Sequence, residues 1–134
     1  MDFTDHLKKF EYAFGTMYCY ENYVIGNLNP EVKVTNAIAI QMLDDINKHF
    51  GNGKIVFISN REFGNEVDPK VYKLVNPATM IGIAIVGSTQ EQKIQAAIEQ
   101  SLYGGSFGYF NTLESAVVWA KSFTLDSNLL STSE

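Results

Sequence analysis

Cysteine is scarce in this chain, since Cys19 is the only one among 134 residues. A single thiol excludes an internal disulfide framework, and it excludes a structural zinc site built from four cysteines. The absence of cysteine pairs suits a reducing compartment, so we expect a cytoplasmic protein. Cys19 has no basic neighbour in the sequence that would lower the pKa of its thiol, which favours a small buried residue over a nucleophile.

Basic residues and long apolar runs are scarce as well. The chain has 10 Lys and Arg against 15 Asp and Glu, and its formal charge is −5. Only Lys8 and Lys9 are adjacent among the basic residues, which argues against a nucleic-acid surface. The longest apolar runs, such as residues 83–86, are far shorter than the roughly 20 residues that a membrane-spanning helix needs. Residues 1–6 lack the apolar segment of a signal peptide.

Apolar side chains, in contrast, are plentiful. Hydrophobic residues make up 46% of the chain and aromatic residues 13%, which is enough to build a core without a metal or disulfide. The length suits a single domain. We therefore expect one domain over residues 1–123, followed by a polar, serine-rich tail over residues 124–134 that frays.

Aromatic residues alternate with other residues near the start of the chain. Between residues 10 and 20 this period of two predicts one strand, with its aromatic side chains on one face and Cys19 on the other. Gly15 within it indicates a bulge or bend. A second strand over residues 23–28 would complete an antiparallel hairpin. An aromatic strand near a sheet edge is also a candidate partner surface, and its candidate interaction residues are Tyr12, Tyr18 and Tyr20.

Strands and helices alternate in the rest of the chain. The expected elements are a helix over Asn36–Phe50 capped by Thr35 or Asn36, a strand over Lys54–Asn60, a short helix from Asp68-Pro69 to Val75, a strand over Ile81–Val86, a helix after Gly87, a strand over Ser106–Phe110 and a helix capped by Asn111 with Glu114. In the helix after Gly87, Ser88 and Glu91 fit a capping box. Its buried stripe is expected to be Ile94, Ala97, Ile98 and Leu102. This order predicts an α/β domain with a mostly parallel sheet flanked by helices.

Residues suited to catalysis are few and dispersed. His6 lies in the polar N-terminal segment and His49 at a helix end, and neither has a metal-binding partner at ligand spacing. Asp44 and Asp45 are adjacent on a helix, so their side chains diverge by about 100° and face solvent instead of forming a pair. We therefore expect no catalytic residue, no metal site and no cofactor.

One polar cluster, Ser59, Asn60 and Arg61, ends an expected interior strand. Open α/β sheets bind ligands at the carboxyl ends of their strands, which makes these three residues a candidate ligand or partner site. Arg61 is the only arginine of the chain. Its alternative role is that of a surface charge paired with Glu62 or Glu66.

Four segments together form a familiar order. They are Val24-Ile25-Gly26-Asn27-Leu28, the strand from Ile55 to Asn60, Ile83-Ala84-Ile85-Val86-Gly87, and the closing run from Phe110 to Trp119. Over about residues 23–123 this order resembles the SpoIIAA-like family of the STAS superfamily. Ile58-Ser59-Asn60-Arg61 followed by Val67-Asp68-Pro69 is similar to small uncharacterised STAS-like proteins of bacteria.

The resemblance implies a compact α/β domain related to anti-sigma factor antagonists. In antagonists that switch by phosphorylation, a serine starts the helix after the strand that corresponds to residues 55–59. Here that helix starts with Asp68-Pro69-Lys70 and has no hydroxyl at its start, so Ser59 at the strand end is the phosphorylation candidate. We expect a non-enzymatic interaction or regulatory module whose partner is an unidentified protein or a second copy of the chain. Because the fold also resembles lipid-transfer domains, the alternative is a small apolar or lipid-like ligand held between sheet and helices.

Overall fold

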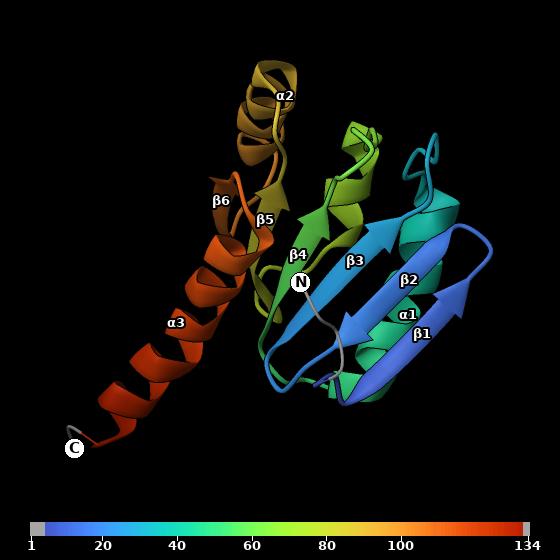
Figure 1. Ribbon diagram of the computed structural model, residues 1–134. Helices are drawn as coiled ribbons and strands as arrows, with labels where there is room; N and C mark the ends of the chain where they lie inside the picture. Colours follow the sequence, from blue (N-terminus) through green and yellow to red (C-terminus); the bar gives the residue numbers. More distant parts are fainter. Residues whose placement is uncertain (1–4, 133–134) are drawn as a thin grey trace.

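Six β-strands form one mixed sheet. They span Lys8–Tyr12 (β1), Gly15–Cys19 (β2), Tyr23–Leu28 (β3), Ile55–Asn60 (β4), Met80–Val86 (β5) and Ser106–Phe110 (β6), and they lie side by side in that order (Figure 1). The pairings from β1 to β3 are antiparallel and those from β3 to β6 are parallel, so the expected mostly parallel sheet is instead a mixed one. The computed structural model describes the backbone of residues 5–132 and the side chains of residues 5–123.

The single strand expected over residues 10–20 is two strands, β1 and β2. Ala13 and Phe14 form the turn between them, and Gly15 begins β2. A Cβ atom on Gly15 would lie 2.3 Å from the carbonyl oxygen of Asn27 on β3, so only glycine fits this position. The N-terminal unit is therefore a three-stranded antiparallel meander, of which the predicted hairpin is the second half.

This extra turn also overturns the prediction of one aromatic face. Phe10 pairs with Met17 and Lys9 pairs with Tyr18 across the two strands. Paired residues share a face of the sheet, so Phe10 and Tyr12 lie on the same side as Met17, and Tyr18 lies on the opposite side. A two-residue turn shifts the alternation of side chains between the two faces of the sheet by one residue, so even-numbered residues change face after the turn. A single continuous strand would keep them all on one face.

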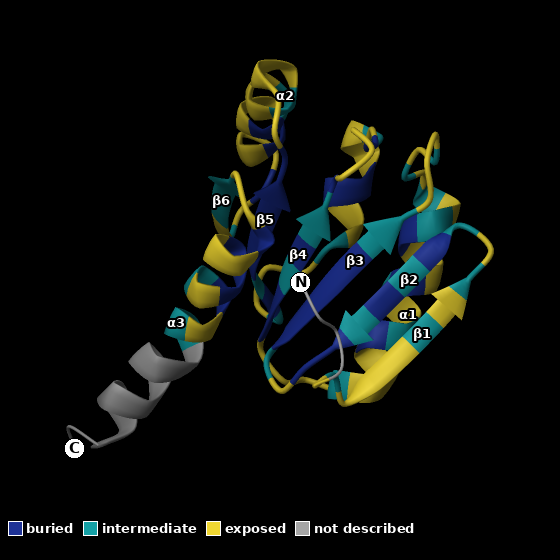
Figure 2. Cartoon of the chain, viewed as in Figure 1, coloured by how far each residue is buried: buried dark blue, intermediate teal, exposed yellow. Residues whose placement is uncertain are grey.

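Helices cover both faces of the sheet. The helix α1 (Asn36–Phe50) and the 3₁₀ helix η1 (Pro69–Leu74) pack on one face, α3 (Leu113–Thr132) packs on the other, and α2 (Gln90–Gln100) stands beyond the end of β5 (Figure 1). Figure 2 shows that buried residues concentrate in the central strands β3, β4 and β5. The core under α1 includes Met17, Val24, Met42, Ile46, Ile83 and Ile85. The core under α3 includes Ile25, Val56, Ile58, Ala84, Ala116 and Ala120.

Helices α1 and α3 begin with hydroxyl caps. The side chain of Thr35 accepts the N–H of Ile38, which confirms one of the two expected caps of α1. For α3, Thr112 accepts the N–H of Ser115 at 3.2 Å, so the cap lies one residue after the expected Asn111. The α3 backbone stays helical to residue 132, within the expected tail, while residues 133–134 of that tail lie outside the described residues. The domain boundary at residue 123 stays a prediction.

Candidate functional site

The three residues of the predicted polar cluster lie at the carboxyl end of β4, between β3 and β5. Their side chains do not converge on one point, because alternate residues of a strand face opposite sides. The amide nitrogen of Asn60 donates to Asn27 Oδ1 at 2.8 Å on the neighbouring strand. Ser59 faces the other side, where its hydroxyl oxygen accepts from Arg61 Nε at 3.2 Å.

Arg61 belongs to a buried ion pair. Its Nη1 and Nη2 donate to the two carboxylate oxygens of Glu99 on α2, each at 2.6 Å. The hydroxyl of Tyr72 on η1 donates to the same carboxylate. Arg61 is 4% exposed and Glu99 is 0% exposed. The expected surface pairing with Glu62 or Glu66 is therefore wrong: both of those side chains are exposed, and Arg61 turns inward.

The two hydrogen-bond donors of this cluster, Arg61 and Tyr72, have raised pKa values. Burial works to lower the pKa of Arg61, but hydrogen bonding to the Glu99 carboxylate and its negative charge outweigh burial and raise that pKa above its usual value. Burial, together with the same carboxylate, raises the pKa of Tyr72. Both donors therefore keep their protons at physiological pH. The guanidinium of Arg61 thus joins β4 to α2 and η1.

Gln92 connects α2 to the same strand end. Its Nε2 donates to the carbonyl oxygen of Arg61 at 2.9 Å, while its Oε1 accepts the N–H groups of Ser88 at 2.7 Å and Thr89 at 3.0 Å. The hydroxyl of Thr89 accepts the N–H of Gln92, which completes a capping box. The box predicted for Ser88 and Glu91 therefore lies one residue later. The pattern Thr-x-x-Gln was the available sequence signal for it.

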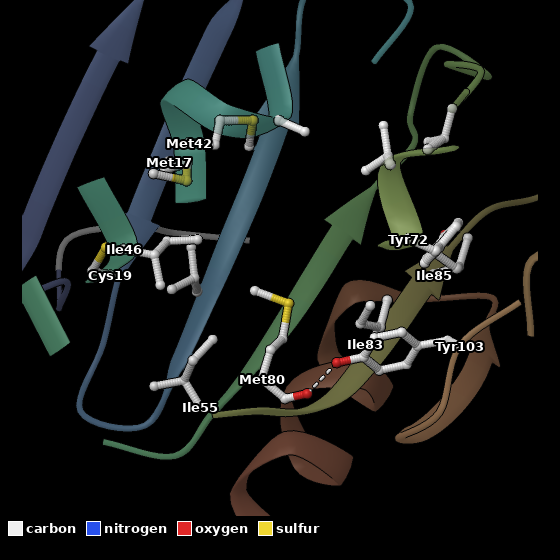
Figure 3. Close-up of a cluster of buried hydrophobic side chains, with 14 of the residues drawn as sticks. Met17, Cys19, Met42, Ile46, Ile55, Tyr72, Met80, Ile83, Ile85 and Tyr103 are labelled. Atoms are coloured by element: carbon white, nitrogen blue, oxygen red, sulfur yellow. Dashed lines mark hydrogen bonds between the residues drawn. The ribbon is translucent and has the colours of Figure 1, made fainter. Parts of the chain in front are cut away.

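A small apolar cavity adjoins the ion pair. Its volume is about 90 Å³ and it lies between the sheet and α1, with η1 beside it. Figure 3 shows Met42 and Ile46 of α1 on the same side of the sheet as Ile85 of β5, and all three line this cavity. Its polar lining residues are Ser59, Arg61 and Tyr72. One end of the cavity therefore meets the ion-pair cluster.

A larger, polar concavity lies at the carboxyl ends of β4 and β5. Its volume is about 770 Å³, and the loop of residues 61–67 and the first turns of α2 form its walls. The charged lining residues besides Arg61 are Lys33, Glu62, Glu66 and Glu91. The hydroxyls of Ser88 and Thr89 lie among these lining residues, which include no histidine or cysteine. This arrangement can hold a polar group.

Helix α2 exposes the face that we predicted to be buried. Its buried residues are Ala96 and Glu99. Ile94, Ile98 and Leu102, which we expected inside, are 54%, 52% and 45% exposed. The prediction of a buried aliphatic stripe is wrong because the glutamate is needed inside to pair with the guanidinium of β4. An aliphatic row with a spacing of four residues consequently faces outward.

Of the candidate interaction aromatics, Tyr12 adjoins the core under α1, whereas Tyr18 and Tyr20 adjoin the core under α3. Tyr12 donates its hydroxyl to Asp45 Oδ2 at 2.5 Å, so Asp45 is not simply a solvated charge. The ring of Tyr18 lies 5.3 Å from that of His6, and the ring of Tyr20 stacks on Tyr23 at 4.6 Å. These tyrosines do not form one shared surface.

Cys19 is fully buried, as the sequence indicates. Burial is the main cause that raises the pKa of its thiol to about 11. At neutral pH the side chain is therefore a protonated thiol packed in the core.

Within residues 5–132, no helix is both long enough and apolar enough to cross a membrane. Within residues 5–123, whose side chains are described, no group of three or more His, Cys, Asp or Glu is placed to bind a metal ion.

Comparison with known proteins gives one informative likeness. No protein-family model matches the chain, and no curated protein matches it. Among solved structures, the fold is similar to an uncharacterised protein of the DUF3478 family from Shewanella loihica PV-4, which is described as having a SpoIIAA-like fold. The TM-score is 0.57 at 17% sequence identity, over 81% of this chain and 92% of the other. This chain has a SpoIIAA-like α/β fold, as the motifs in its sequence indicate.

Proposed function

We propose that the protein is a non-enzymatic interaction module and that the outward face of α2 binds a partner protein. The observation that carries this proposal is the orientation of the helix. Surface helices usually bury their apolar stripe. Here Glu99 is inside, and Ile94, Ile98 and Leu102 are about half exposed.

The charge around this stripe supports an apolar partner. Apart from buried Glu99, the charged residues of α2 are Glu91 and Lys93, which have opposite signs. The outward face therefore carries no net charge, and it selects a partner by shape and apolar contact. A row of aliphatic side chains at helical spacing suits the apolar face of a partner helix or a groove of similar length.

Paired variants test this proposal. Ile94→Ser with Ile98→Ser removes the centre of the stripe, and Val118→Ser removes an aliphatic side chain on α3 that is 70% exposed. Each protein serves as bait in lysate of the native host, with quantitative mass spectrometry of what it retains. We expect the wild type and Val118→Ser to retain the same partner and the double variant to lose it.

The controls separate binding from folding. Because the substituted side chains are exposed, all variants should melt within a few degrees of the wild type. A double variant that folds and still retains the same partner at the same level contradicts the proposal. Retention of nothing specific by the wild type contradicts it as well.

A second candidate function is the binding of a small apolar ligand, which the apolar lining of the inner cavity favours. The volume of about 90 Å³ is well below the roughly 300–1,000 Å³ of typical ligand sites. It suits a molecule of a few carbon atoms, whereas a lipid chain would require α1 to move away from the sheet. Native mass spectrometry of wild type and Ala39→Leu tests this, because Ala39 lines the cavity and leucine would fill it. A mass excess that the variant loses supports the candidate, and a clean wild-type mass contradicts it.

A further inference from the structure

The two edges of the sheet differ sharply in chemistry. At the β1 edge, Lys8, Lys9 and Glu11 are exposed, and Lys9 pairs with Glu11 at 2.9 Å. Charges of this kind keep an edge strand from pairing with another chain. At the opposite edge lies β6, Ser106–Phe110, which has no charged residue and no proline and pairs with β5 without a register shift (Figure 1). This second edge lacks the usual protection.

The outward backbone groups of β6 belong to Phe107 and Tyr109. The N–H of Gly87 donates to the carbonyl oxygen of Phe110 at 3.0 Å, so Phe110 turns its backbone toward β5. In a parallel ladder this direction alternates, and Phe107 and Tyr109 therefore direct their N–H and C=O groups away from the sheet. Among the residues that the structure describes, no loop or further strand bonds to these groups.

Half-buried aromatic rings lie on both sides of this edge. Phe107 and Tyr109 pack against the core under α1. On the other face, the ring of Phe110 lies 5.4 Å from Trp119, which contacts Phe123 at 4.9 Å. A strand added to β6 would cover these rings further, and aromatic side chains contribute strongly to such contacts.

We propose that β6 pairs antiparallel with β6 of a second copy of this chain, around a two-fold axis at Gly108. In this register Phe107 lies opposite the partner's Tyr109, and Tyr109 lies opposite the partner's Phe107. Both outward-facing residues then exchange backbone hydrogen bonds with an outward-facing residue, and all five residues of β6 are paired. Gly108 meets the partner's Gly108 at the axis, where side chains of the two strands would otherwise be closest.

The self-matching register of β6 favours a second copy as the occupant, and the uncharged edge permits it. Each chain carries a formal charge of −5, which opposes self-association in general. The β6 edge itself is uncharged, so no like charges meet across the proposed axis. Because five residues and a few half-buried rings cover less than the roughly 1,200–2,000 Å² of stable complexes, this dimer dissociates on dilution.

Sedimentation of the full chain tests the proposal, with two variants that each add one lysine. Ser106→Lys places a charge on the exposed start of β6, and Leu7→Lys places the same charge beside β1, where Leu7 is 69% exposed. For the wild type, the average mass should rise from 15.0 kDa toward twice that value between about 1 and about 500 μM. Ser106→Lys should raise the midpoint concentration at least about tenfold, and Leu7→Lys should leave it nearly unchanged.

Amide hydrogen exchange locates the interface. The amides of Phe107 and Tyr109 should exchange quickly in dilute samples and become protected in concentrated ones. The amides of Gly108 and Phe110, which face β5, should be protected in both. A chain that stays monomeric over the whole range overturns the proposal. A dimer that uses another surface also overturns it. Such a dimer would have the same midpoint concentration with Ser106→Lys as without it, and its Phe107 and Tyr109 amides would stay unprotected.

Discussion

Replacing Glu99 with leucine should destabilise the fold more than almost any other single substitution. The carboxylate accepts three hydrogen bonds, two from Arg61 and one from Tyr72, and it is fully buried. Leucine would leave a guanidinium charge and a hydroxyl buried without a partner. Removing one member of a buried ion pair costs about 3–5 kcal/mol, a large share of the roughly 5–15 kcal/mol that stabilises a typical domain.

A double-mutant cycle makes this prediction specific to the pair. Arg61→Met alone should also be strongly destabilising, because it leaves the Glu99 carboxylate without its counter-charge. The double variant Arg61→Met with Glu99→Leu removes both charges, so it should be more stable than either single variant. Adding Tyr72→Phe to the double variant should recover about 1 kcal/mol more by removing the unpartnered hydroxyl.

Urea unfolding followed by far-UV circular dichroism measures these free energies. Glu91→Leu is the matched control, because Glu91 is an exposed glutamate on the same helix, and its cost should stay below about 1 kcal/mol. Two results would refute the reasoning. One is a Glu99→Leu cost as small as that of the control, and the other is a double variant whose loss equals the sum of the two single losses.

Three further predictions concern caps, buried phenols and the thiol. Thr89→Ala should cost about 1 kcal/mol in urea unfolding and Ser88→Ala less than about 0.5 kcal/mol, because Thr89 is the cap; equal costs would contradict this. Burial raises the pKa of Tyr103 to about 12 and also raises that of Tyr72, while unfolded tyrosine titrates near about 10. The contribution of both phenols to stability is therefore complete below about pH 10. That of Tyr103 is lost between about pH 10 and 12 and that of Tyr72 declines from about pH 10 upward, so the urea midpoint should fall from pH 9 to pH 11. Cys19 should react with a disulfide reagent at pH 8 only after urea unfolds the chain, and rapid native labelling would contradict its burial.

Much of the α/β part of the fold could be read from local sequence. The helix at residues 36–50 is bounded by a hydroxyl cap and a glycine-rich stop, and its bounds are confirmed. The strands at residues 55–60 and 106–110 are short apolar or aromatic runs set off by turn residues. The bounds of the second are confirmed, and the first begins one residue after the expected Lys54. In these segments the local signals agree with what the tertiary structure requires.

The N-terminal meander could not be read in the same way. Its first turn consists of Ala13 and Phe14, which lack the Asn-Gly chemistry that usually marks a two-residue hairpin turn. The aromatic residues keep their period of two from Phe10 through that turn to Phe14. Gly15 was the only local sign of the turn, and glycine is needed there because the carbonyl oxygen of Asn27, on a different strand, lies too close for a Cβ atom.

The ion pair was beyond local reasoning because its members are 38 residues apart. In addition, α2 carries two stripes with helical spacing. One is aliphatic, with Ile94 and Ile98, and the other is polar, with Gln92 and Glu99. Periodicity shows that two faces exist, but it cannot choose which one is buried. That choice depends on a charge at the end of β4.

The free energies of apolar burial and of ion pairing explain why the polar stripe of α2 is the buried one. Turning the helix to bury Ile94 and Ile98, with Leu102 just after it, would gain roughly half of the about 1.5–3 kcal/mol that full burial of each gives, so about 2–4.5 kcal/mol in total. It would also leave Arg61 buried without Glu99, at a cost of about 3–5 kcal/mol. The two free energies are comparable, so the gain from burying the aliphatic stripe does not outweigh the loss of the ion pair. The exposed aliphatic stripe is thus a consequence of pairing Arg61. A partner that covers this stripe can recover the free energy that the fold leaves unused, which is the physical reason to look for the binding surface on α2.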